Sequence, residues 1–147
     1  MTEQQQLAAP PGHNSVALCG RVSSVPLERD LPSGDTIVTF RVVLSREKTP
    51  MTARSKQASD WVDCVAWGRR VRRGVSTWRV GDVVEVEGAL RRRFFRVDGS
   101  TSTRVEVEVL SGRIIERAAT RPATSPATSP ATRTGTRSAT RAGSGAR

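Results

Sequence analysis

Apolar and polar side chains alternate along one long stretch of the chain, residues 14–116. Around Phe40, for example, the apolar Val38 and Phe40 alternate with Thr39 and Arg41. A period of two places successive side chains on opposite faces, which is typical of a β-strand with one buried face. The pattern predicts five strands, at residues 16–22, 38–44, 61–67, 83–95 and 104–109.

One segment follows a helical period instead. Val71, Val75 and Trp78 are spaced as i, i+4 and i+7, which predicts a short helix within residues 68–79, although Gly74 weakens it. Five strands with one helix between the third and the fourth is the arrangement of the OB-fold, an all-β Greek-key barrel that often binds oligonucleotides. Turn-forming residues at 30–35 and 98–100 and an aperiodic polar segment at 46–59 separate the strands.

The third strand predicts where two tryptophans point. Its small apolar residues Val62, Cys64 and Ala66 share one face, which we expect to be buried, so Trp61 and Trp67 lie on the outer face. Two exposed aromatic rings on one strand form a stacking platform for bases. The alternative is that both tryptophans pack under a loop or against a partner subunit.

The fourth strand gives a similar assignment for two phenylalanines. Phe94 shares its parity with the apolar Val84 and Val86 and is the core candidate, whereas Phe95 is expected to be exposed beside arginines. Arg92 interrupts the inward set, and a β-bulge there would exchange the two faces. Phe40 and Trp78 are predicted to be core residues.

The charge of the chain favours a polyanionic partner. The 147 residues include 24 Lys and Arg against 14 Asp and Glu, a net charge of +10, and only Lys48 and Lys56 are lysines. Arginine binds phosphate through a planar fork and stacks on π faces, so this bias indicates nucleic acid; a genome rich in G and C is the alternative explanation. Basic residues gather on the outer strand face (Arg41, Arg91, Arg93), beside the helix (Arg69, Arg70, Arg72, Arg73) and in the 46–59 loop (Arg46, Lys48, Arg54, Lys56).

The sequence lacks the residues of most catalytic and metal sites. His13 is the only histidine, no phosphate-binding glycine loop or nucleophile elbow is present, and no apolar run reaches the length of a membrane span. The glutamates of the last two strands alternate with valine and are expected to form cross-strand ion pairs. Cys19 and Cys64 are expected in or near the core. We therefore expect no enzymatic activity, no cofactor, no metal, no membrane partner and a cytoplasmic, nucleoid-associated protein.

Composition divides the chain into three parts. Residues 1–13 are polar and Gln-rich and are expected to form a flexible leader, and residues 14–116 hold the barrel. Residues 117–147 contain six Arg, no acid and no aliphatic side chain larger than Ala. Such a segment cannot bury enough apolar surface to fold, so we expect a disordered basic tail.

Four segments in order resemble the bacterial single-stranded DNA-binding protein (SSB) family. They are NSVALCGRV at 14–22, VTFRVVLS at 38–45, WVDCVAWG at 61–68 and GDVVEVEGALR at 81–91. The resemblance implies an OB-fold that forms a homotetramer and wraps single-stranded DNA without sequence preference. It places Trp61, Trp67 and Phe95 at stacking positions and Arg69, Arg91 and Arg93 at basic positions. With the basic residues assigned above, the predicted nucleic-acid-binding set is Trp61, Trp67, Phe95, Arg41, Arg69, Arg91, Arg93, Lys48 and Lys56.

Two departures from the family matter. Lys48 stands near the place of a further stacking tryptophan, and the sequence ends without the acidic tip by which many members recruit replication and repair enzymes. We therefore do not expect recruitment of repair enzymes by that route. We expect instead a paralogue whose tail contacts DNA. The alternatives to single-stranded DNA binding are an OB-fold adaptor that uses its aromatic face for protein contacts and a binder of single-stranded RNA.

Overall fold

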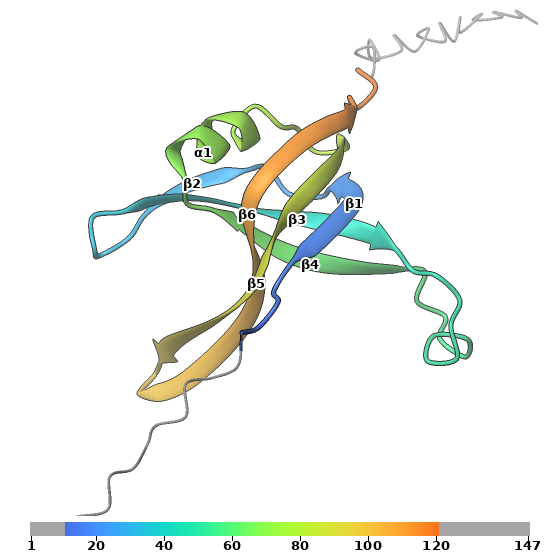
Figure 1. The fold of residues 1–147 in the computed structure, drawn as a ribbon, viewed down its shortest axis with the longest axis horizontal. Helices are drawn as coiled ribbons and strands as arrows, with labels where there is room; N and C mark the ends of the chain where they lie inside the picture. The colour runs from blue at the N-terminus through green and yellow to red at the C-terminus, as the bar shows by residue number, and fades with distance from the viewer. Residues whose placement is uncertain (1–10, 121–147) are drawn as a thin grey trace, which may run out of the picture.

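The computed structural model describes residues 11–120, and its elements follow the predicted order with one addition. The leader and the basic tail fall outside the described residues, apart from 11–13 and 117–120. The elements are β1 (Val16–Val22), β2 (Leu27–Asp30), β3 (Thr36–Ser45), β4 (Ser59–Ala66), α1 (Arg69–Val75), β5 (Val83–Val97) and β6 (Ser100–Glu116) (Figure 1).

The strands close into a barrel. The sheet order is β1-β5-β6-β4-β3-β2. Because β1 also pairs with β3, the five strands β1, β5, β6, β4 and β3 form a closed barrel. The pairing of β4 with β6 is parallel and the other pairings are antiparallel. Five strands in this order, with α1 between β4 and β5, confirm the predicted OB-fold.

The additional strand, β2, pairs with β3 outside the closed barrel. All four of its residues are exposed, so burial imposes no alternation on its sequence. The predicted turn at 30–35 connects it to β3, and the N–H of Leu31 donates to the carbonyl of Asp35 there. This strand was missed because its pairing comes from the hairpin turn and not from a hydrophobic face.

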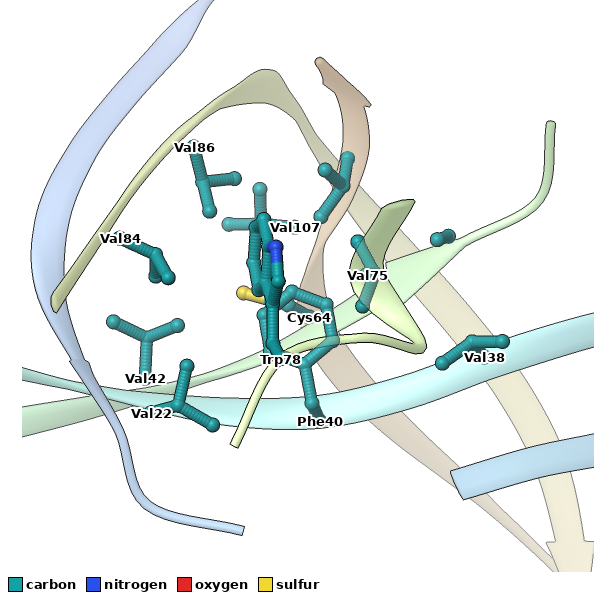
Figure 2. Close-up of a cluster of buried hydrophobic side chains, with 12 residues drawn as sticks. Val22, Val38, Phe40, Val42, Cys64, Val75, Trp78, Val84, Val86 and Val107 are labelled. Carbon is teal, nitrogen blue, oxygen red and sulfur yellow. The ribbon is translucent and has the colours of Figure 1, made fainter. Parts of the chain in front are cut away.

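Trp78 lies in the middle of the barrel core. Its ring meets Phe40 edge to face, with 5.3 Å between ring centroids. Small aliphatic side chains from β1, β3, β5 and β6 surround the two rings, and Val75 of α1 covers them from the side (Figure 2). The core assignment of Phe40 and Trp78 is confirmed. Aromatic rings fill a volume that these strands, which supply mostly valine, leave open.

A β-bulge between Glu87 and Gly88 changes which side chains of β5 face inward. Val84, Val86 and Ala89 are buried, but Leu90 is exposed. The far part of the hairpin of β5 and β6 extends past the barrel (Figure 1). The prediction that Phe94 is a core residue is therefore wrong, and its side chain is 68% exposed. The sequence analysis placed a possible bulge near Arg92, several residues after the observed bulge at Glu87 and Gly88.

Asp82 anchors the end of β6 to the turn before β5. Its buried carboxylate accepts hydrogen bonds from the backbone N–H groups of Ala118 (2.7 Å) and Arg79 (2.9 Å) and from the Arg117 guanidinium (3.2 Å). The bond from Ala118, followed by that from Arg79 and the charge of Arg117, lowers the pKa of Asp82. This contact fixes where the chain leaves the barrel.

The two cysteines differ in environment. Cys64 is buried as expected, and desolvation raises the pKa of its thiol to about 12. A thiol with that pKa stays protonated at neutral pH and is a poor nucleophile. Cys19 is exposed on β1, so its assignment to the core region is wrong.

Candidate nucleic-acid interface

Trp61, Arg41 and Asp63 form one cluster on the outer face of β3 and β4. Arg41 lies directly opposite Asp63 in the pairing, and Val43 lies opposite Trp61. The Arg41 guanidinium stacks 4.0 Å from the centre of the Trp61 ring, and its Nε donates to Asp63 Oδ1 at 2.9 Å. Trp61 is still 57% exposed, so the cluster leaves much of the indole open to a ligand.

The second tryptophan of the predicted platform is separated from the first. Trp67 follows the last residue of β4 and is 39% exposed. Val65 lies between the two tryptophans on the same strand face and is fully buried. The two rings are therefore separate exposed sites, and the continuous stacking surface expected on β4 is interrupted.

Phe95 supplies an aromatic surface on the β5–β6 hairpin. Its ring is 39% exposed and lies 5.7 Å from the guanidinium of Arg104 on β6. Next to it, Arg93 donates to Glu106 at 3.3 Å, and Arg91 donates to Glu108 at 2.7 Å. These bonds, together with that of Arg113 to Glu85, confirm the predicted cross-strand ion pairs for Glu85, Glu106 and Glu108, whereas Glu87 accepts a hydrogen bond from Ser111.

A shallow groove connects these clusters. Two adjoining hollows, of about 270 and 380 Å³, share the side chains of Arg29, Arg93, Arg104 and Glu106. Phe95 lines one hollow and Arg41 lines the other. The groove thus runs between β2 and the β5–β6 hairpin and brings together residues from five strands, β2 to β6.

Arg29 and Arg104 are groove residues that the sequence did not single out. Arg29 belongs to the strand that has no hydrophobic pattern, and Arg104 was placed in a predicted strand without a role. In the described residues neither one forms a salt bridge, whereas Arg41, Arg91 and Arg93 each pair with an acid. The uncompensated charge of the groove therefore comes from the two arginines that were missed.

The remaining predicted residues lie away from the groove. Arg69 is on α1, where it lines a separate hollow, and Trp67 leads into that helix. Lys48 and Lys56 are exposed in the segment between β3 and β4. At the base of this segment, Arg46 Nε donates to Asp60 Oδ2 at 2.9 Å. The hydrogen bond from Arg46 lowers the pKa of Asp60. The predicted site residues Trp67, Arg69, Lys48 and Lys56 therefore do not line the groove.

Within residues 11–120, no three His, Cys, Asp or Glu side chains gather in a way that would hold a metal ion. The same part of the chain contains no helix that is long and apolar enough to cross a membrane.

A five-stranded Greek-key barrel with an arginine- and aromatic-lined groove defines an OB-fold of the oligonucleotide-binding type. Residues 13–115 match the model of the single-strand binding protein family, and the chain belongs to that family. The resemblance drawn from the sequence is thus confirmed.

Named relatives and one solved structure show the extent of the similarity. Single-stranded DNA-binding protein 2 of Streptococcus agalactiae is 26% identical over 107 residues, which are 73% of this chain and 80% of the relative. The single-stranded DNA-binding protein of Aquifex aeolicus is 26% identical over 71% of each chain. The Plasmodium falciparum SSB in its complex with ssDNA has a TM-score of 0.60 at 23% identity, covering 74% of this chain and 98% of that one. This structural match supports the fold.

Proposed function

We propose that the protein binds single-stranded DNA without sequence preference and protects it during replication, recombination or repair. The observation that carries this proposal is the exposed Trp61 ring beside Arg41, at the edge of a groove with Phe95 at its other end. Family membership and the names of the relatives support it. Binding and protecting a strand requires no chemical step, so the proposed role is non-enzymatic.

The geometry favours stacking over phosphate attraction as the main source of affinity. Every base has a π face, and each base stacked on an aromatic ring contributes roughly 1–3 kcal/mol. Arg41 and Arg93 are neutralised by their acids, but their remaining N–H groups still donate to phosphate oxygens. Arg29 and Arg104 supply the unpaired positive charge. Because stacking does not read base edges, binding tolerates any sequence.

We also propose that the barrel assembles into a homotetramer. β1 pairs with β3 only at Arg21 and Val22, so within the described residues the edge of β1 that faces away from β5 has no paired strand from Val16 to Cys19. A hollow at the end of β1, lined by residues 19–23, has a mainly apolar lining that also includes Val43, Val80 and Val83. An unpaired strand edge with an apolar border is suited to pairing with a second copy. Native mass spectrometry measures the assembly directly.

The substitution Trp61→Ala tests the proposed function. Losing one base stack predicts a fall in affinity for an oligo-dT strand of about tenfold or more, with the oligomeric state unchanged. Trp61 is exposed, so the barrel should remain folded, as a thermal melt will show. Unchanged affinity together with dissociation of the oligomer would instead support an adaptor that uses this face for protein contacts. An oligo-U strand of equal length that competes as well as oligo-dT would extend the role to RNA.

A further inference from the structure

Helix α1 is unusually rich in arginine for its length. Its seven residues include four arginines, Arg69, Arg70, Arg72 and Arg73, and its first turn holds no acid. Val75 is buried, Val71 packs against the core, and Arg72 is half-buried. Arg69, Arg70 and Arg73 are exposed and line one shallow hollow together with Gly74.

The charge of this helix has no compensation among the described residues. None of the four arginines forms a salt bridge, whereas Arg41, Arg91 and Arg93 near the groove are all paired with carboxylates. The Nε of Arg72 is buried and has no hydrogen-bond partner. An unpaired donor is costly when it is withdrawn from water, so this end of the barrel lacks an acceptor.

Local electrostatics oppose this arrangement. The N-terminus of a helix carries partial positive charge, so Arg69 and Arg70 in the first turn are unfavourable there. Arg69 and Arg73 are four residues apart on one face and repel each other. Positions that break local rules without a compensating contact are expected at functional sites. A bound anion would relieve both repulsions.

The position of the helix relative to the aromatic residues indicates which anion fits. Trp67 lies between the end of β4 and Gly68, the N-cap of α1, so an exposed ring stands directly before the arginines. α1 itself has no aromatic residue with which to stack a base. Arginine forks match phosphate geometry. We propose that a single strand held in the groove continues past Trp67 and that its phosphates bind Arg70 and Arg73 of α1, beside Arg69.

This inference rests on the proposed function and enlarges the binding site. Only Arg69 of this helix was assigned to the site before, on the basis of the family resemblance. The β5–β6 hairpin, which carries Phe95, and helix α1 lie at opposite ends of the barrel (Figure 1). A strand that contacts both must therefore be longer than one that fills the groove alone.

The double substitution Arg70→Gln/Arg73→Gln, measured with oligo-dT strands of two lengths, tests the inference. A strand of about 8 nucleotides fits within the usual site size of one OB-fold, and one of about 35 extends beyond it. We expect the variant to bind the short strand as the unchanged protein does. For the long strand, the slope of log affinity against log salt should weaken by about 1.4, or 0.7 for each lost phosphate contact. Arg70→Lys/Arg73→Lys should largely retain the slope.

Arg92→Gln/Arg96→Gln is the matched control. It removes the same charge from the hairpin face opposite Phe95, where neither arginine has a salt bridge within residues 11–120. An equal change in slope for this control would show a general effect of net charge and overturn the inference. Unchanged long-strand binding by Arg70→Gln/Arg73→Gln, or an equal loss for both lengths, would overturn it as well.

A duplex competitor distinguishes a continuing strand from a second one. A duplex that binds through Arg70 and Arg73 without displacing the short strand would show that α1 holds separate nucleic acid, and the continuous path would be wrong. Failure of the unchanged protein to bind the short strand would instead contradict the proposed function, so the two failures are distinguishable.

Discussion

At the scale of single residues, the arginines fall into two groups that the sequence does not separate. Arg41, Arg91 and Arg93 share their charge with Asp63, Glu108 and Glu106, and those of α1 share it with no acid. A guanidinium that already has a carboxylate adds little net attraction for phosphate but remains a fixed hydrogen-bond donor. The paired arginines near the groove are therefore suited to orient a strand, and the unpaired ones to attract it.

Asp82 gives a prediction for stability against pH. Its pKa is lowered in the folded state, so its contribution is present above the unfolded pKa of about 3.9 and is lost as the pH falls through the folded value. Asp82→Asn should lower the free energy of unfolding at pH 7 by about 1–3 kcal/mol, because hydrogen bonds to a buried charge are weakened. Urea denaturation at pH 7, 5 and 3 measures both effects.

The variant should also lose less stability than the unchanged protein between pH 5 and pH 3, since asparagine does not titrate. Asp60, whose pKa is also lowered, is present in both proteins and cancels in the comparison. Equal acid sensitivity in the two proteins would contradict the assigned role of Asp82.

At the scale of elements, the hydrophobic pattern of the sequence predicts the strands that have one buried face. It does not predict a strand that is fully exposed or a change of face at a bulge. β3 alternates cleanly because Val38, Phe40 and Val42 face the core. β2 has no buried face, and β5 changes faces at a bulge that Gly88 permits but does not specify. The outward assignment of Trp61 needed only the parity of β4. The groove itself depends on how β2 and the hairpin meet in space, which periodicity does not encode.

Two glycines test this description of the elements. A Cβ on Gly88 would overlap the carbonyl oxygen of Glu108, so Gly88→Ala should reduce stability by about 2 kcal/mol or more through overpacking at the bulge. A Cβ on Gly74 meets nothing within 4 Å, and Gly74→Ala should stabilise the protein by about 0.5–1 kcal/mol through helix propensity. Chemical denaturation of both variants checks the pair. An unchanged free energy of unfolding for Gly88→Ala would show that β5 and β6 pack less closely at Gly88 than described.

At the scale of the whole molecule, the basic segment after the barrel remains a prediction. Residues 121–147 carry five arginines and no acid, and Ala118, shortly before this segment, donates a hydrogen bond to Asp82. If all five contact phosphates, truncation after Thr120 should weaken the salt dependence of single-strand binding by about 3.5 units of log–log slope, or 0.7 for each contact. An unchanged slope would make the segment a passive extension. Ending the truncation at Thr120 retains Ala118 and its bond to Asp82.

The central claim is that the exposed rings of Trp61, Trp67 and Phe95 stack on unpaired bases, and intrinsic tryptophan fluorescence tests it most directly. Trp61 and Trp67 are exposed and Trp78 is buried, so titration with unlabelled poly-dT should quench the first two and leave a residual signal from the third. A duplex of equal length should cause little quenching, because its bases are already stacked. The absence of quenching by poly-dT, or equal quenching by the duplex, would contradict the account.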